Sequence, residues 1–476
     1  MNNKLFVSLP YIYPVCPLNI DHSRMFIIAD IIARYSRKKG KEVVFPVASH
    51  YSGNTAQNIA SVFVEIYRKG KPDEKSERIF SLFKNVYGTP DYILKDFVNP
   101  LNILDYYSQE ILWELKTLNV SCDYDHFYTT KQESFSSFVR TIISQYKKEG
   151  LLIENTKEEL ALDYDNVEWK SNAEELLNNT GFIQLFQKNI VLSAMKNVRS
   201  DWGLLRKGGY GVKYDEDWVI DPMFDSELFT IFDLYVHFKN EDLMQGIDEK
   251  KLFEELFDVL RNGVETDNLL INKIINFLPC DLFVCEEHLK NWIVKRIYAE
   301  SCLSHEKYQT KKYFVTGMGL LHGKRMSASK GSAILTKDLI RLYGPVLARL
   351  IILLTGGHPS KIYHYDHNLP GQSSKMLDNF INYILYLLAI KDESTEDNPD
   401  NGNRIFLDNI EKSIEKYIEN GFFKQAIVEL ISIIPKKYKK VDRTTADKIL
   451  RIYSQYLDIF LPGLLINFNL DKKMYE

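Results

Sequence analysis

Residues 5–47 read LFVSLPYIYPVCPLNIDHSRMFIIADIIARYSRKKGKEVVFPV, and this stretch decides the fold class. The apolar runs at 5–9 and 42–47 predict two buried strands. Between them, apolar side chains recur at helical spacing from Met25 to Tyr35. A strand, a helix and a second strand in one short stretch make a right-handed βαβ unit. We therefore expect an α/β protein with a Rossmann-like, doubly wound parallel sheet.

The same unit indicates where a ligand would bind. A proline-rich loop, residues 10–17, connects the first strand to the helix. Folds of this kind bind ligands beyond the carboxyl ends of their strands, where helix N-termini attract anionic groups. Further apolar runs at 281–284 and 313–316 indicate that the sheet is completed late in the chain. We expect the functional site at the loop.

The composition excludes several classes of protein. The 476 residues are 26% charged and 45% hydrophobic, as in an ordinary globular protein of two or three domains. The net charge of −4 means that a nucleic acid would have to bind a local basic face. Five scattered cysteines without a CxxC pair favour free thiols, and we expect no protein-bound metal. Without a signal-peptide pattern or a membrane-length apolar run, we expect a cytoplasmic protein that does not bind a membrane.

Four stretches resemble the motifs of one enzyme family. Residues 12–22, IYPVCPLNIDH, stand where the family has PYPNGPLHIGH, and residues 30–40, DIIARYSRKKG, are similar to its DxxARYxRxxG. Residues 45–55, FPVASHYSGNT, are similar to FPMAFHITGTP, and residues 317–332, GMGLLHGKRMSASKGS, to GxLLxGxKMSKSKGN. Several motifs in family order are far more specific than one. The chain therefore resembles the class I aminoacyl-tRNA synthetases, and among them the leucyl-tRNA synthetases of archaeal and eukaryotic type.

The resemblance implies an enzyme that uses ATP with Mg²⁺ to activate an amino acid as its aminoacyl adenylate. In that family, the histidines of the first motif and the lysines of the KMSKS loop bring positive charge to phosphate oxygens. The corresponding catalytic candidates are His22, Asn19, Arg325, Ser327, Ser329 and Lys330. The nucleotide-binding candidates are Pro14, Asp21, Glu286 and Met326. The substrate-binding candidates are Tyr13, Ala48, His50 and Gly53.

The departures from the family motifs lie on the nucleotide side. Asn19 stands at the first histidine and can donate a hydrogen bond but carries no charge. Asp21 stands at the glycine, where it adds bulk and negative charge near a helix N-terminus. We favour the alternative interpretation that Asp21 is the N-cap of that helix, worth about 1 kcal/mol. Ala328 replaces the central lysine of KMSKS, and Glu286 and Ile293 replace a glycine and a histidine after a late strand.

The amino-acid side is closer to the family, because all four substrate-binding candidates match its motifs. Their neighbours differ and make the predicted pocket more polar: Tyr51, Ser52, Asn54 and Thr55. A polar pocket argues against plain leucine, so we expect an amino acid that is leucine-like or more polar. An alternative interpretation of His50 is a histidine at a strand end that serves the structure alone.

Two domains are expected. Residues 1–335 would form the Rossmann-like catalytic domain, with a helical insertion at about 54–275. Only about ten residues separate a helix ending near 150 from a return strand at 160, which leaves no room for the editing domain of the family. Residues 336–476 follow a helical pattern and resemble a truncated anticodon-binding bundle.

Three hypotheses on function remain open. The leading one is a leucyl-type paralogue that activates an amino acid and transfers it to tRNA or to a small acceptor, without editing. The second is a catalytically degenerate paralogue that binds tRNA, an amino acid or a protein partner in a regulatory role. The third is transfer of an aminoacyl group from charged tRNA without ATP.

Overall fold

The computed structural model describes residues 3–70, 72–154, 160–199, 201–392 and 401–468. A parallel sheet of five strands lies at its centre, in the order β2, β1, β11, β12, β7. These strands are β1 (Lys4–Ser8), β2 (Glu42–Val44), β7 (Gly181–Phe182), β11 (Asp281–Cys285) and β12 (Lys312–Thr316). The expected Rossmann-like sheet is therefore confirmed, including its completion late in the chain.

Helix α1 (Ile20–Lys38) follows β1 through the proline-rich loop, and its apolar side chains are buried in the main core. Asn19 is its N-cap, because the side-chain oxygen accepts a hydrogen bond from the backbone N–H of His22 at 3.0 Å. The expectation that Asp21 caps this helix is wrong. Asp21 lies inside the first turn, two residues after the cap, so its carboxylate is free to bond elsewhere.

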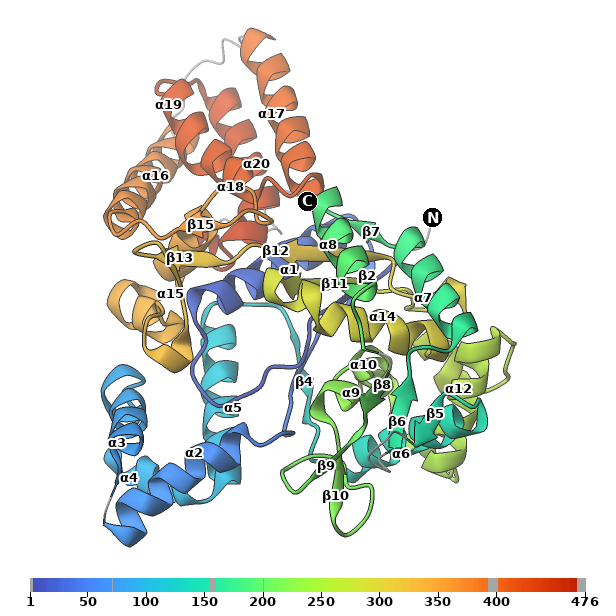
Figure 1. Ribbon diagram of the computed structural model, residues 1–476. Coiled ribbons are helices and arrows are strands. Elements are labelled where there is room, and N and C mark those ends of the chain that lie inside the picture. Colours follow the sequence, from blue (N-terminus) through green and yellow to red (C-terminus); the bar gives the residue numbers. More distant parts are fainter. Residues whose placement is uncertain (1–2, 71, 155–159, 200, 393–400, 469–476) are drawn as a thin grey trace.

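Between β2 and β11 the chain makes two excursions from the sheet, and the short strand β7 returns to the sheet within the second. First, β3 (Pro46–Ser49) pairs in parallel with β4 (Asp123–Thr129), and the helices between these two strands form an arm with its own aromatic core. The arm contains four α-helices: α2 (Thr55–Val64), α3 (Glu74–Ser81), α4 (Asp91–Leu94) and α5 (Pro100–Thr117). Figure 1 shows the arm away from the sheet, with the long helix α5 leading back toward it.

The second excursion mixes helices with short antiparallel strands, whereas the sequence analysis expected a helical insertion with one return strand at 160. Three strands form one sheet: β5 (Leu152–Glu154), β6 (Leu160–Asp163) and β8 (Asp201–Gly203). Two more form a hairpin: β9 (Leu205–Lys207) and β10 (Trp218–Ile220). These strands share an apolar core with four helices: α6 (Glu133–Lys148), α10 (Phe229–Phe238), α12 (Glu249–Asn262) and α14 (Trp292–Leu303), which follows β11. Strands this short give too weak a periodic signal to be separated from loops.

Residues after 335 are mostly helical. Helix α15 (Thr336–Leu354) kinks at Gly344, whose φ is 74°, immediately before Pro345. Beyond a short strand, the remaining helices gather in the bundle at the top of Figure 1: α16 (Leu369–Asp392), α17 (Asn401–Glu419), α18 (Phe423–Val428), α19 (Ile434–Lys437) and α20 (Arg443–Phe460). Among the helices of the described ranges, none combines the length and apolar character needed to cross a membrane.

A buried ion pair joins α1 to this helical region. The carboxylate of Asp30, fully buried, accepts hydrogen bonds from the guanidinium of Arg349 on α15 and from the backbone N–H of Ser121 at 2.7 Å. Arg349 also donates to the carbonyls of Leu118 at 2.9 Å and Phe460 at 2.7 Å. One charged pair thereby holds the ends of α5 and α20 against α1 and α15.

A second buried chain of hydrogen bonds ties the proline-rich loop to β4 and α10. The hydroxyls of Tyr11 and Tyr128 lie 2.5 Å apart, and the Tyr128 hydroxyl donates to Asp233 at 2.7 Å. Asp233 is buried on α10, and burial raises the pKa of its carboxyl group to about 7.

We expect Asp30→Ala to lower the free energy of unfolding by about 3–5 kcal/mol, because it leaves the Arg349 guanidinium buried without its counter-ion. Urea unfolding measures the effect. The matched control is Asp91→Ala, which breaks an exposed pair with Lys84 at 2.9 Å and should cost less than about 1 kcal/mol. Equal losses in the two variants would contradict the assignment.

Stability should fall as the pH rises from about 4 to about 7, because folded Asp233 keeps a proton that the unfolded chain has released. This group contributes a slope of up to about 1.4 kcal/mol per pH unit. Asp233→Asn keeps an acceptor for the Tyr128 hydroxyl and should remove that contribution, whereas Asp125→Asn at an exposed carboxylate should not. Urea unfolding across this pH range measures both variants, and an unchanged slope in Asp233→Asn would refute the prediction.

Candidate functional site

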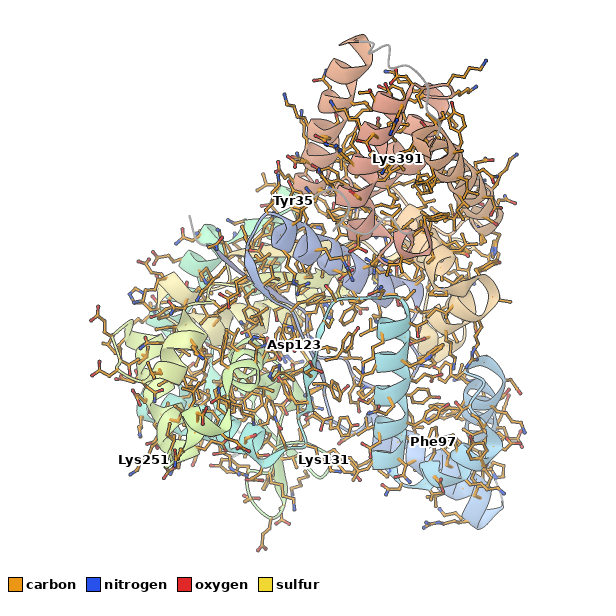
Figure 2. The ribbon with its side chains drawn as sticks, turned by 180° about the vertical axis from the view of Figure 1, so that it is seen from behind. Tyr35, Phe97, Asp123, Lys131, Lys251 and Lys391 are labelled. Carbon is orange, nitrogen blue, oxygen red and sulfur yellow. The ribbon has the colours of Figure 1, made fainter. Side chains whose placement is uncertain are left out.

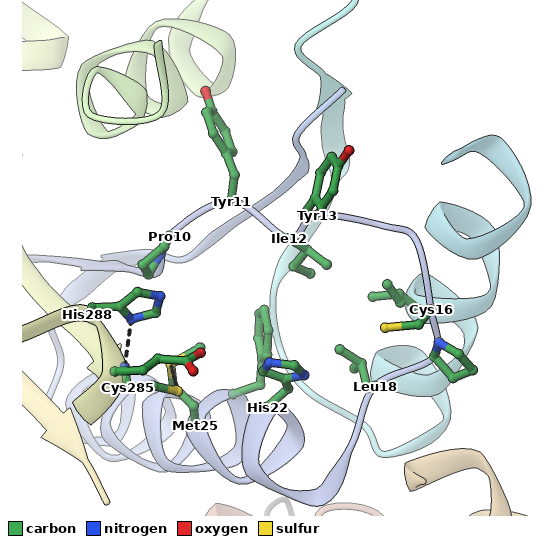
Figure 3. Close-up of a pocket in the computed structure, with 14 residues that line it drawn as sticks. Pro10, Tyr11, Ile12, Tyr13, Cys16, Leu18, His22, Met25, Cys285 and His288 are labelled. Atoms are coloured by element: carbon green, nitrogen blue, oxygen red, sulfur yellow. Dashed lines mark hydrogen bonds between the residues drawn. The ribbon is translucent and has the colours of Figure 1, made fainter. Parts of the chain in front are cut away.

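A cavity of about 240 Å³ opens where the carboxyl ends of β1 and β11 meet the start of α1. Figure 3 shows the proline-rich loop along one wall and the first turns of α1 along another. Tyr11, Tyr13 and Cys16 of the loop, His22 of α1 and His288 after β11 line it. The expectation that the site lies at residues 10–17 agrees with this geometry.

Two histidines and a glutamate are among the side chains that line this cavity. Burial lowers the pKa of His22, and the charge of Glu287 opposes that shift. Burial also lowers the pKa of His288, again opposed by Glu287. The Nδ1 atom of His288 accepts a hydrogen bond from the backbone N–H of Cys285 at 3.1 Å, so a neutral ring carries its proton on Nε2.

Sequence analysis missed Glu287 and His288 and selected Glu286 instead. Glu286 is half-buried at the start of the short helix 286–290 and is not among the lining residues of the cavity. One rule could have identified them. Ligands in such folds bind beyond the carboxyl ends of the strands, and Glu287 and His288 come directly after β11.

A second cavity of about 330 Å³ adjoins the first and shares four lining residues with it, including Tyr13 and His288. His50, Ser52 and Gly53 line it from the end of β3, and Arg206 and Trp292 from the opposite side. Three of the four substrate-binding candidates therefore lie together here. Ala48, the fourth, is buried in β3 and lines neither of these two cavities.

His50 is held by a buried carboxylate. Its Nε2 atom lies 2.7 Å from Asp225, whose other oxygen accepts a hydrogen bond from the Ser52 hydroxyl at 3.0 Å. Burial raises the pKa of Asp225, and His50 and Ser52 oppose that shift. Tyr11 stacks on the other side, with its ring 5.5 Å from the imidazole. His50 thus has structural partners and also lines the cavity, so its part in substrate binding stays a prediction.

Gly53 needs to be a glycine, because its φ is 95°. Its backbone N–H donates to the carbonyl of Tyr210 at 2.7 Å, which fixes the rim of the cavity against the β9–β10 region. A Cβ at this position would also contact Pro222 at 3.4 Å.

Other parts of the protein contact Asp21 in the first turn of α1, where the resemblance places the nucleotide. The Asp21 carboxylate accepts hydrogen bonds from the backbone N–H of Gly319 at 3.0 Å and from the Tyr363 hydroxyl at 2.7 Å. Burial raises the pKa of Asp21, opposed by these two bonds and by nearby cations. A Cβ at Gly319 would lie 2.6 Å from the Tyr363 ring and 2.0 Å from the methyl group of the buried Met326. The residues present therefore do not fit an adenine at this point in the way that the resemblance implies.

The other predicted nucleotide-side residues are scattered. Arg325 is exposed in the short strand β14 (Lys324–Arg325), which pairs with β13 (Gly319–Leu321), and Lys330 is exposed beyond it. The hydroxyl of Tyr87 on the helical arm donates to the Ala328 carbonyl at 2.9 Å. Seven of the predicted catalytic and nucleotide-binding residues line neither of the two cavities: Pro14, Asn19, Asp21, Arg325, Met326, Ser327 and Lys330. The side chain of Ser329 lies outside the described part of the structure.

Comparison with known proteins gives relatives over part of the sequence. No family model matches the chain. Leucine--tRNA ligase 2 of Sulfurisphaera tokodaii is 30% identical over 154 residues, which are 32% of this chain and 15% of that relative. Leucine--tRNA ligase 1 of Saccharolobus solfataricus is 31% identical over 150 residues, which are 32% of this chain and 15% of that relative. The Leucine--tRNA ligase of Archaeoglobus fulgidus is 31% identical over 153 residues, which are 32% of this chain and 16% of that relative. The matched region thus spans about a sixth of the relatives' length.

Solved structures match over nearly the whole chain. A methionyl-tRNA synthetase of Mycobacterium tuberculosis bound by methionyl-adenylate superposes with a TM-score of 0.65 at 13% identity, covering 97% of this chain and 92% of that one. A second structure of that synthetase with methionyl-adenylate gives 0.63 at 14% identity, with the same coverage. The chain therefore has the fold of the class I aminoacyl-tRNA synthetases and is similar in sequence to archaeal leucyl-tRNA ligases over about a third of its length.

Proposed function

We propose that this protein binds an amino acid in the two adjoining cavities and does not activate it with ATP by the route of the class I synthetases. The observation that carries the proposal is the Asp21 carboxylate, bonded to Gly319 and Tyr363. This is the second of the three hypotheses from the sequence, a degenerate paralogue that retains the amino-acid side of its site.

The energetic argument concerns what ATP would have to displace. Two hydrogen bonds to a charged group are each worth about 1.5–3 kcal/mol, and both would be lost if an adenine took their place beside Asp21. The carboxylate also brings negative charge to the helix N-terminus, where a phosphate would need positive potential. Ala328 provides no charge in the KMSKS-like loop, where the lysines and arginines are Lys324, Arg325 and Lys330.

The amino-acid side has the opposite character. Its cavity is built from parts fixed in place: His50 between Asp225 and Tyr11, Ser52 on Asp225, and Gly53 on the rim. Pre-organised polar groups of this kind reject an analogue that leaves them without partners. We therefore infer an amino acid with a polar side chain rather than leucine.

A second candidate function, transfer of an already activated aminoacyl group, is favoured by the His22, Glu287 and His288 cluster. His288 lines both cavities with its proton on Nε2, so a hydrogen-bond donor stands beside the place where the amino acid would lie. His22, whose pKa burial lowers, is the candidate proton acceptor in the first cavity. Such a transfer needs no ATP and would use tRNA or a small acceptor as partner.

ATP–pyrophosphate exchange should be absent from the purified protein with each of the standard amino acids. Exchange that is lost in His22→Ala would refute the proposal and restore the activating enzyme as the leading hypothesis.

Asp21→Gly removes the carboxylate from Gly319 and Tyr363 and should raise the affinity for ATP in isothermal titration, because the adenine side is opened. Ile20→Val, a conservative change at the neighbouring buried residue, should leave that affinity unchanged.

Ser52→Ala should weaken binding of the cognate polar amino acid about five- to tenfold, because one wall of the cavity loses its hydroxyl. Asp225 keeps His50 as a partner, so the variant is expected to fold. Thermal-shift screening of the amino acids followed by calorimetry measures the change. Ser61→Ala, at an exposed hydroxyl of α2, is the matched control and should have no effect. An amino acid bound equally by both variants would place the binding site elsewhere.

A further inference from the structure

Three side chains with metal-binding chemistry converge at a place that the proposed function does not use. Asp123 begins β4, His126 lies three residues further along it, and His237 lies near the end of α10. The Asp123 carboxylate lies 2.9 Å from Nδ1 of His126 and is bonded to Nδ1 of His237. One ligand atom from each residue lies within 4.8 Å of the other two.

This cluster is separate from the cavities. β3 and β4 run parallel, with Pro46 opposite Asp123 at their beginnings and Ser49 opposite Thr129 at their ends. His50 of the amino-acid cavity follows the end of β3, so Asp123 lies at the opposite end of the strand pair. Figure 2 shows Asp123 well apart from Lys131, which lies just past the end of β4.

Solvent can reach all three residues. Their side chains are 18%, 42% and 23% exposed, in the order Asp123, His126 and His237. A partly open site of this kind lets an ion enter without unfolding and leaves room for a water molecule as a further ligand.

We propose that Asp123, His126 and His237 bind one divalent transition-metal ion of the zinc class. Two imidazole nitrogens and one carboxylate oxygen form a donor set typical of Zn²⁺, Co²⁺ and Ni²⁺, whereas Mg²⁺ and Ca²⁺ prefer oxygen alone. Metal–ligand bonds of about 2.0–2.1 Å put tetrahedral ligand atoms about 3.3 Å apart. The 2.9 Å separation between Asp123 and Nδ1 of His126 therefore needs to widen by a few tenths of an ångström, and the shorter contact between Asp123 and Nδ1 of His237 needs to widen further.

The competing explanation is a carboxylate that accepts hydrogen bonds from two imidazole N–H groups. In that case each Nδ1 holds a proton, and no ion is needed to keep the three groups together. The two explanations differ in one measurable respect, because metal binding requires both Nδ1 atoms without protons. Moving a proton from Nδ1 to Nε2 of a neutral histidine provides this without breaking the fold.

A bound ion would add a second link between β4 and α10, which the Tyr128–Asp233 hydrogen bond already joins. Because the ligands come from residues 123–126 and 237, an ion that binds only the folded chain stabilises it by mass action. The proposal does not depend on what the cavities bind. It differs from the expectation of no protein-bound metal, which rested on cysteine spacing and stays a prediction until metal binding is measured.

The experiment uses the full chain, treated with a chelator and then freed of it. We expect Co²⁺ to bind with one ion per chain and to give visible d–d absorption bands, and Zn²⁺ to displace it and to raise the unfolding temperature. His126→Ala and His237→Gln should each weaken Zn²⁺ binding at least tenfold. The matched control is His322→Ala, in a stacked histidine pair with ring centroids 5.3 Å apart, which should bind as the wild type does.

His126 is the most exposed of the three, so His126→Ala is expected to fold, and the metal-free unfolding temperature checks this. If His237→Gln fails to fold, His126→Ala decides the question alone. Absence of binding with one ion per chain, or an equal affinity in His126→Ala and the wild type, overturns the proposal.

Discussion

The arrangement of this protein depends on the buried ion pair between Asp30 and Arg349. Helix α1 carries the cap, the Asp21 carboxylate and His22 at one end, and Asp30 fixes the middle of the same helix against α15 and the turn after α5. An unpaired charge at either position would be costly in this interior, which makes the pairing nearly obligatory once the chain is compact. The orientation of the first turn of α1, which lines the cavity, therefore depends on Asp30 further along the same helix. Asp30 belongs to the stretch that resembles DxxARYxRxxG and lines neither cavity.

Two buried carboxylates near α1 have different surroundings. On the side of β3, the carboxylate of Asp225 organises His50 and Ser52 around an open cavity. On the side of β13, the carboxylate of Asp21 binds Gly319 and Tyr363 and fills the space. The same chemical group therefore has two different settings, because Asp225 binds two side chains that line a cavity whereas Asp21 binds a backbone N–H and a tyrosine hydroxyl and lines neither cavity. The proposed function depends on this difference.

Much of the fold could be read from residues 5–47, since the strand, loop, helix and strand are contiguous and their apolar periodicity is strong. The candidates Tyr13, His22, His50 and Gly53 do line the adjoining cavities. The role of Asp21 was misjudged, because the N-cap preference of aspartate is a local rule and Asn19 satisfies it two residues earlier. Glu287 and His288 were missed, since their position depends on where β11 ends relative to α1.

The sequence by itself determined the fold class, the order of the motifs and the loop at which a ligand site forms, because each depends on residues close together in the chain. Only the tertiary structure decided what the polar residues do. Asp21 meets Tyr363, His50 meets Asp225, and Asp123 meets His237 across more than a hundred residues of sequence. No periodicity or spacing encodes such meetings, since they arise only when the whole chain has packed and each buried polar group has found the partner that offsets its lost hydration.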